Sequence, residues 1–152
     1  MQIETNHLIT KQLHSIIHDE TNRIANLSNA SALLFEHLDH INWAGFYLWD
    51  DTDNELILGP FQGKVACIRI SNGSGVCGTA FDKGETIVVP DVNEFPGHIV
   101  CDAASQSEIV IPLIKDGKKV GVLDIDAPIK NRLTAEDQAM LEEFVSVLIH
   151  SI

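Results

Sequence analysis

Residues 107–127 read SEIVIPLIKDGKKVGVLDIDA, and this stretch decides the fold. Two runs rich in Ile, Val and Leu lie on either side of the segment KDGK. Apolar runs of this kind are typical of buried strands, and an Asp-Gly pair between two of them is a strong signal for a β-hairpin. The sequence therefore predicts two neighbouring antiparallel strands.

Three carboxylates interrupt these apolar strands. Glu108 begins the first strand, and Asp124 and Asp126 lie near the end of the second. Asp is depleted in strands, and side chains two residues apart point to the same face, so Asp124 and Asp126 share a face. A solvent-facing surface is the simplest interpretation. The alternative is a cluster that holds an ammonium group or a proton for delivery.

The length of the hairpin loop decides whether Glu108 joins the two aspartates. A two-residue loop would place Glu108 on the face away from Asp124, because a slip of one residue reverses every side chain. A three-residue loop, residues 115–117, places Glu108 directly opposite Asp124. We expect the longer loop, with Gly117 at positive φ in a bulge, and all three carboxylates on the face near Cys101.

The order of elements predicts an α+β fold. Helical periodicity covers residues 5–39, with a break near residues 19–21, and returns after Thr134 and Asp137, which resemble a capping box. Between these helices lie the hairpin and four further predicted strands, WAGFYLWD, ELILGPF, VACIRI and ETIVVPD. Because strands do not alternate with helices, we expect one domain, residues 1–152. Its antiparallel sheet of about six strands is packed by N-terminal and C-terminal helices.

Charge and composition exclude several classes of protein. Ten Lys and Arg stand against 22 Asp and Glu, a net charge of −12, so there is no basic surface for nucleic acid or an anionic membrane. The N-terminus lacks the basic and apolar regions of a signal peptide, which predicts a cytoplasmic protein. Three cysteines in such a protein are unlike a structural disulfide framework, and reduced core thiols are the plain alternative to a reactive site.

Two other motifs carry weaker signals. The segment GSGVCG, residues 73–78, matches the dinucleotide fingerprint, but the residues that follow are too short for a crossover helix. Cys67, Cys77, Cys101 and His98 could form a zinc site, but no two cysteines have the short spacing of a zinc knuckle. We therefore expect no metal and no nucleotide cofactor.

Five motifs in order resemble the free methionine-(R)-sulfoxide reductase family. They are NWAGFYL, LGPFQGKVACIRI, GVCGTA, VPDVNEFPGHIVCDAASQSEIVIPL and GVLDIDAP. The resemblance covers about residues 42–137 and implies a GAF fold for the single domain. It also implies an enzyme that reduces the free amino acid rather than protein-bound methionine sulfoxide.

The resemblance assigns roles to eight residues. Cys101 matches the catalytic cysteine, Cys67 the cysteine that closes a disulfide with it, and Cys77 an auxiliary cysteine. The other five match the substrate pocket: the carboxylates Glu108, Asp124 and Asp126 and the aromatic residues Trp43 and Tyr47.

The residue types suit the implied chemistry. A thiolate is the effective nucleophile toward sulfoxide sulfur, and clustered acids can hold a carboxyl group protonated for the departing oxygen. A sulfenic acid on Cys101 would condense with a second thiol, and an external dithiol such as thioredoxin would reduce the disulfide. The family also implies a homodimer. A ligand-sensing GAF module and a redox-sensing thiol switch are the alternatives.

Overall fold

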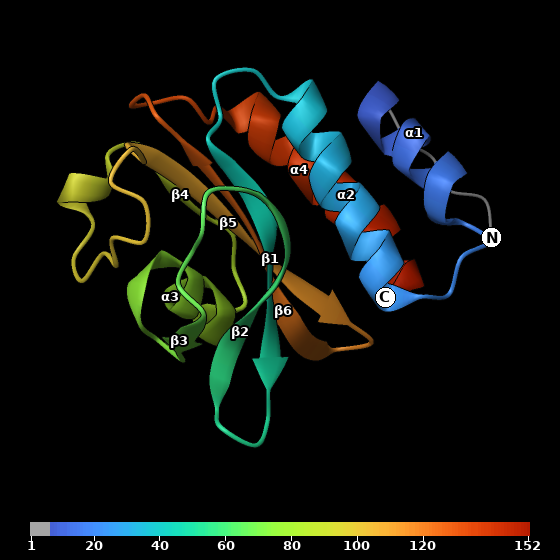
Figure 1. Cartoon of the computed structure of the whole chain (residues 1–152), viewed down its shortest axis with the longest axis horizontal. Helices are drawn as coiled ribbons and strands as arrows, with labels where there is room; N and C mark the ends of the chain where they lie inside the picture. The colour runs from blue at the N-terminus through green and yellow to red at the C-terminus, as the bar shows by residue number, and fades with distance from the viewer. Residues whose placement is uncertain (1–6) are drawn as a thin grey trace.

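A six-stranded antiparallel sheet forms the centre of the protein, with strand order β3-β2-β1-β6-β5-β4 (Figure 1). The computed structural model describes residues 7–152. The helices are α1 (Leu8–Ile17), α2 (Arg23–His37), α3 (Gly75–Lys83) and α4 (Ala135–Leu148), with short 3-10 helices η1 (Val92–Glu94) and η2 (Ile149–Ser151). The strands are β1 (Trp43–Asp50), β2 (Glu55–Gly63), β3 (Arg69–Ser71), β4 (Ile87–Val89), β5 (Ser107–Lys115) and β6 (Lys118–Ala127).

The predicted α+β class and the six-stranded sheet are confirmed. The predicted helical stretch 5–39 is divided between α1 and α2, and residues 5 and 6 lie outside the described part of the chain. Two strands are shorter than predicted. Only residues 69–71 of the third and 87–89 of the fourth join the sheet, so the chain around Cys67 is a loop and not a strand.

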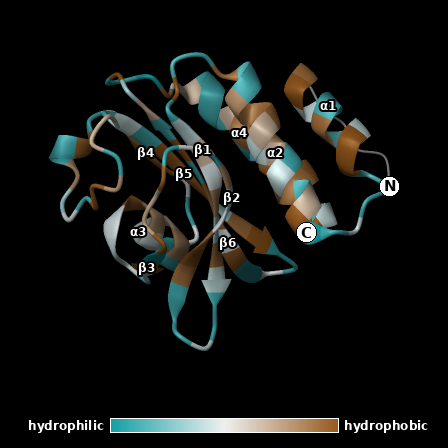
Figure 2. Ribbon diagram, viewed as in Figure 1, coloured by the Kyte–Doolittle hydropathy of each residue, from teal (hydrophilic) through white to brown (hydrophobic). Residues whose placement is uncertain are grey.

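The two faces of the sheet are covered differently. Helices α1, α2 and α4 lie against one face, which we call the core face, and α3 lies against the other, the pocket face (Figure 1). Alternation along the strands divides the side chains: Phe46, Ile109 and Leu123 are buried on the core face, whereas Tyr47 and Val110 lie on the pocket face. Figure 2 shows hydrophobic residues along β5 and β6 and hydrophilic residues in the connecting loops.

Helix α3 was not expected. Residues 75–83 form a nine-residue helix that is too short to cross between parallel strands but long enough to cover part of the pocket face. Gly84 ends it in the left-handed conformation (φ 65°) that glycine adopts without penalty. Because every strand pair is antiparallel, GSGVCG belongs to no dinucleotide-binding unit.

The predicted three-residue hairpin loop is wrong, although the three carboxylates still share one face of the sheet. Lys115 pairs with Lys118, so the loop has two residues. Asp116 (φ 52°) and Gly117 (φ 79°) both have positive φ, as in the type I′ turn that matches the twist of paired strands. Asp tolerates this conformation, which is why a two-residue loop forms here. The positive φ of Gly117 is confirmed.

A bulge restores the shared face. Between the pairs Leu113–Gly121 and Ile114–Lys119, Val120 is an extra residue on β6. Glu108 therefore lies opposite Asp126, and Val110 lies opposite Asp124. The predicted pair of Glu108 with Asp124 is wrong, because the partner of Glu108 lies two residues further along β6. Directly opposed residues share a face, and all three carboxylates lie on the pocket face as expected.

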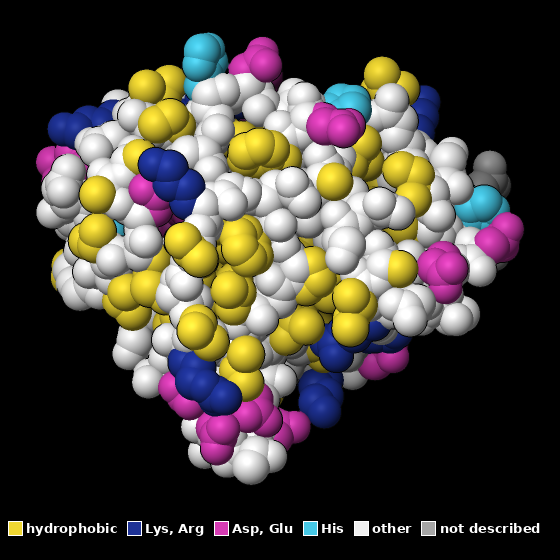
Figure 3. Space-filling model, viewed as in Figure 1, with side chains coloured by type: hydrophobic (Ala, Val, Ile, Leu, Met, Phe, Trp, Pro, Cys, Tyr) yellow, Lys and Arg dark blue, Asp and Glu magenta, His cyan; other side chains and the backbone are white. Residues whose placement is uncertain are grey.

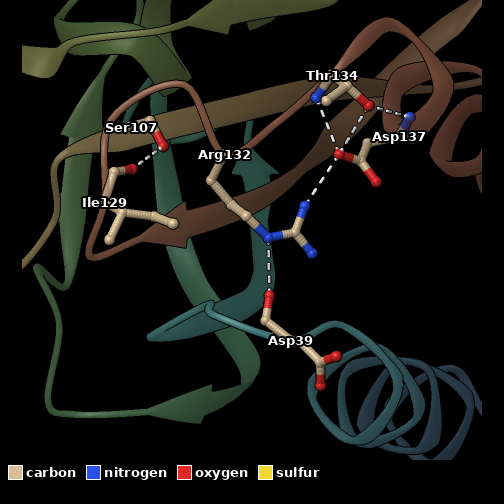
Figure 4. Close-up of polar contacts among 6 residues, drawn as sticks. All are labelled: Asp39, Ser107, Ile129, Arg132, Thr134 and Asp137. Atoms are coloured by element: carbon tan, nitrogen blue, oxygen red, sulfur yellow. Dashed lines mark hydrogen bonds and ion pairs between the residues drawn. The ribbon is translucent and has the colours of Figure 1, made fainter.

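Polar contacts fix the segment that leads from β6 into α4 (Figure 4). Thr134 and Asp137 form the predicted capping box at the start of α4. Arg132 donates from Nη1 to Asp137 Oδ2 (3.0 Å) and from Nε to the carbonyl of Asp39 beyond α2 (2.8 Å). These bonds connect the segment that follows α2 to the segment that leads into α4. Within residues 7–152, none of the helices combines the length and apolar composition needed to cross a bilayer.

Candidate active site

A pocket opens on the pocket face, between the sheet, α3 and two loops. The loops are residues 64–68, between β2 and β3, and residues 95–106, between η1 and β5. Seven of the eight predicted site residues line this pocket: Trp43, Tyr47, Cys77, Cys101, Glu108, Asp124 and Asp126. The eighth, Cys67, is bonded to one of them. Residues from β1, α3, β5, β6 and both loops thus converge on one place.

Cys67 and Cys101 form a disulfide that connects the two loops across the pocket. Their Cα atoms lie 5.4 Å apart although 34 residues separate them in the chain. This is the pairing that the family resemblance implies. Cys77 is a free, buried thiol. With two cysteines joined as a disulfide, the zinc set of three cysteines and His98 is not available in this state of the protein.

The three carboxylates lie deep in the pocket. Glu108 and Asp124 are each 6% exposed, and Asp126 is partly exposed. Burial raises the pKa of all three carboxyl groups well above their ordinary values, and repulsion among the three raises them further. Protons are therefore retained here at a pH where ordinary carboxyl groups have lost them. Asp124 Oδ1 is buried without a hydrogen-bond partner, an acceptor that a ligand could satisfy.

Cys77, in the first turn of α3, lies against these acids. Its Sγ donates to Glu108 Oε2 at 3.9 Å. Burial raises the pKa of this thiol, and the neighbouring Asp124 and Glu108 raise it further, so the thiol form is favoured. One ligand atom each from Cys77, Glu108 and Asp124 lie within 4.8 Å of one another and could hold a metal ion. Protonated acids and a protonated thiol are poor ligands, however, and are better suited to supplying protons.

The two aromatic residues hold the loop that carries Cys67. Tyr47 Oη donates to the carbonyl oxygen of Cys67 (2.9 Å), and Trp43 Nε1 donates to that of Lys64 (3.2 Å). The two rings stack with centroids 5.8 Å apart. Burial raises the pKa of Tyr47, and Asp124 adds to the shift, so the phenol remains a donor. Both residues therefore position the loop as well as lining the pocket.

Sequence reasoning missed the role of His98 beside the acids. It weighed this residue only as a zinc ligand. In the structure His98 Nε2 lies 3.6 Å from Glu108 Oε1, and burial lowers the pKa of the imidazole. Its position three residues before Cys101 was the available signal, because it placed an acid-base group near the reactive sulfur.

Asn42 was also missed, and it anchors the loop that carries Cys101. Its Nδ2 donates to Asp102 Oδ2 (3.0 Å) and to Ser105 Oγ (3.1 Å). Its backbone N–H donates to the carbonyl of Asp126 (2.9 Å). One residue just before β1 thus connects the acid-bearing strand, through its backbone, to the cysteine loop, through its side chain. Nothing in the local pattern around Asn42 predicted this, since the loop lies 60 residues away in the chain.

Proteins of a known family are similar to this chain over nearly its whole length. The GAF domain family matches residues 25–148. The free methionine-R-sulfoxide reductase of Escherichia coli is 49% identical over 140 residues, which cover 92% of this chain and 84% of that protein. The chain belongs to the free methionine-R-sulfoxide reductase family.

Two solved structures of this family are closely similar. The fRMsr of Staphylococcus aureus in its reduced form is 53% identical, with a TM-score of 0.91, covering 99% of this chain and 98% of that one. The free methionine-R-sulfoxide reductase of Neisseria meningitidis, in complex with its substrate, is 41% identical, with a TM-score of 0.91, covering 99% of this chain and 93% of that one. The GAF fold expected for the free methionine-R-sulfoxide reductase family is therefore confirmed.

Proposed function

We propose that this protein reduces free L-methionine-(R)-sulfoxide to methionine, with Cys101 as the nucleophile and Cys67 as the resolving thiol. The observation that carries the proposal is the Cys67–Cys101 disulfide across a pocket that contains three buried carboxylates. The family relatives support the same substrate, since those of E. coli and N. meningitidis are named for it.

The thiols provide the two electrons for the reaction. With the disulfide reduced, the Cys101 thiolate attacks the sulfoxide sulfur. An S–S bond forms between Cys101 and the substrate as the S–O bond breaks and the protonated oxygen leaves as water. A water molecule then attacks Cys101 Sγ, breaks this S–S bond and releases methionine, which leaves a sulfenic acid on Cys101. The Cys67 thiol then displaces this oxygen as water and forms the disulfide. An external dithiol restores both thiols and is itself oxidised to a disulfide, so electrons and atoms balance over the cycle.

The carboxylates provide the proton. Sulfoxide oxygen is a poor leaving group until it is protonated, and a carboxyl group with a raised pKa keeps its proton to higher pH and can supply it. Glu108 and Asp124 have this property, since burial raises their pKa values. His98 lines the pocket with its Nε2 3.6 Å from Glu108 Oε1, where it can return a proton after each turnover.

Recognition of the free amino acid follows from the same acids. A free methionine sulfoxide carries an ammonium group, and a peptide-bound residue has a neutral amide in its place. An ammonium could donate to the unpartnered Asp124 Oδ1, with Asp126 partly exposed beside it. A neutral amide brings no positive charge into this cluster of acids, which disfavours peptides.

The setting of the reaction follows from the need for a reductant. We propose thioredoxin as the physiological dithiol, with no bound cofactor on this chain, and a reducing compartment such as the cytoplasm as its location. The homodimer implied by the family stays a prediction. Turnover in this setting would protect the free methionine pool from oxidative damage.

The decisive experiment measures methionine formation with dithiothreitol as the reductant. We expect turnover of free methionine-(R)-sulfoxide, little turnover of the S epimer, and a kcat/KM for N-acetyl-methionine-(R)-sulfoxide lower by about 100-fold, because acetylation removes the ammonium charge. A Cys101→Ser variant is the control for reduction by dithiothreitol alone. Equal kcat/KM for the free and acetylated substrates would contradict recognition by the acids.

A further inference from the structure

Exposed apolar side chains lie on both sides of the disulfide. Next to Cys67, Val65 is 90% exposed and Ile68 is 66% exposed. Next to Cys101, Val100 is 69% exposed and Ile99 is 38% exposed. We call these four side chains the disulfide rim: Val65, Ile68, Ile99 and Val100. Large apolar side chains exposed together, from two loops that the disulfide joins, mark a surface with a binding role.

The disulfide rim also has few acids beside it. Residues 61–68 and 95–101 contain no Asp or Glu, although the chain has 22 acids and a net charge of −12, and Asp102 directly follows Cys101. Lys64 and His98 are the basic residues in these two segments. In Figure 3, hydrophobic side chains gather near the centre of the face over which the loop between β2 and β3 crosses β1 in Figure 1, and acids lie mainly toward the edges.

The chemistry of the bond limits what can cover this surface. A disulfide is reopened by a thiolate that reaches one of its sulfur atoms, so the reductant must contact the residues beside Cys67 and Cys101. Both cysteines are partly exposed and can be reached. A small polar thiol gains nothing from four apolar side chains. A protein with apolar residues around its dithiol buries them.

We propose that the disulfide rim is the docking surface for a small dithiol protein of the thioredoxin type. This inference rests on the proposed function, because it concerns the reductant of the same disulfide. The bound partner's thiolate attacks one sulfur of the Cys67–Cys101 bond and releases the other as a thiolate. The partner's second thiol then attacks the mixed disulfide. The partner dissociates with its own disulfide formed, and Cys67 and Cys101 are both reduced.

The test compares two reductants in the same variants. Ile68→Asp and Val100→Asp introduce a charge at rim positions whose side chains do not line the pocket. With dithiothreitol, kcat and the KM for the sulfoxide should stay within about twofold of the wild type. With thioredoxin, thioredoxin reductase and NADPH, kcat/KM for thioredoxin should fall by about tenfold or more, as for a loss of 1.4 kcal/mol at an interface.

Matched controls separate docking from other effects. Ile24→Asp, on α2, adds the same charge at a side chain that is 68% exposed and far from the disulfide, and should leave both assays unchanged. Ile68→Ser tests the loss of apolar area without a new charge and should give a smaller loss with thioredoxin. An unchanged kcat/KM for thioredoxin in both Asp variants overturns the docking proposal. An equal loss with both reductants overturns it too, because the pocket would then be damaged.

The outcome is independent of the proposed activity. Wild-type protein that fails to reduce the sulfoxide with dithiothreitol contradicts the proposed function before any rim variant is measured. Wild-type protein that succeeds with dithiothreitol, together with rim variants that use thioredoxin normally, contradicts the docking surface alone.

Discussion

The two faces of the sheet use neighbouring residues for opposite purposes. On β6, Leu123 and Ile125 are fully buried on the core face among α1, α2 and α4. Asp124 and Asp126 alternate with them and point into the pocket on the other face. The core face buries mainly apolar side chains from β1, β5 and β6. The pocket face places carboxyl groups among apolar neighbours such as Val110 and Val122, where their charged forms are unfavourable.

This difference shows how one strand can provide stability and reactivity together. The core face gains free energy from each apolar side chain that it buries. Burying acids on the pocket face costs free energy, and it also raises the pKa of these acids, so that they keep their protons to higher pH. Alternation along the strand keeps the two effects separate, so changes on each face should have separate consequences.

The largest expected effect comes from the core face. Leu123→Ala removes a fully buried side chain and should lower the free energy of unfolding by about 2–5 kcal/mol, from lost transfer energy and the cavity left behind. Urea titration followed by circular dichroism measures this loss. Under conditions where the variant is folded, kcat/KM should stay within about twofold of the wild type. A loss of activity without a loss of stability would break the division between the faces.

Substitution of the adjacent residue, Asp124, should lower activity and leave the fold intact. Asp124→Asn removes an acid from the pocket and should lower kcat/KM by about 100-fold, within the range for the loss of a positioned acid. The substitution is nearly isosteric, so the fold should be retained. Steady-state kinetics with dithiothreitol tests this against Leu123→Ala, and a kcat/KM close to that of the wild type would remove Asp124 from the site.

Relative to the wild type, the Asp124→Asn variant should become more stable as the pH rises. The pKa of Asp124 is raised in the folded state, so its contribution is fully present below the unfolded pKa of about 4 and is lost as pH rises toward the folded pKa. Asn carries no proton to lose. Thermal unfolding should therefore show a difference between variant and wild type that grows from pH 4 to pH 8, by roughly 1.4 kcal/mol for each unit of pKa shift. A constant difference would contradict burial as the cause of the shift.

The smallest effect is expected from the hairpin. Deleting Val120 removes the extra residue of the bulge and leaves a regular ladder, in which Glu108 still lies opposite Asp126. Activity should stay within a few-fold of the wild type, and stability should fall by about 1–2 kcal/mol through lost packing of one partly buried side chain. As a control, deleting Leu123 instead moves Asp124 and Asp126 to the opposite face of the sheet relative to the rest of β6, and this should abolish activity.

The hairpin also shows how far the sequence alone could go. The two strands, the positive φ of Gly117 and the shared face of the acids were predictable from local pattern. The two-residue loop and the bulge at Val120 could not be predicted. The shorter loop shifts the strand register by one residue and the bulge shifts it by one more, so the acids reach the same face as with the three-residue loop that was expected. Sequence reasoning reached the right face through the wrong register.

The site divides in the same way. The three cysteines and three acids could be identified from residue type and family resemblance. The contacts of Asn42 with the Cys101 loop and of Tyr47 with the Cys67 loop could not, because they join positions 60 and 20 residues apart through the folded sheet. The helix at residues 75–83 was missed because three glycines lie within the segment GSGVCG that opens it, and glycine is unfavourable in isolated helices.

A single-turnover assay tests the central claim most directly, that Cys101 reacts with the sulfoxide in a pocket of protonated acids. Fully reduced wild type, Cys67→Ser and Cys101→Ser are mixed with excess free methionine-(R)-sulfoxide in the absence of reductant, and methionine is counted per protein. We expect about one methionine from the wild type and from Cys67→Ser, since both retain the nucleophile, and none from Cys101→Ser. Methionine from Cys101→Ser in the same amount as from the wild type would contradict the account.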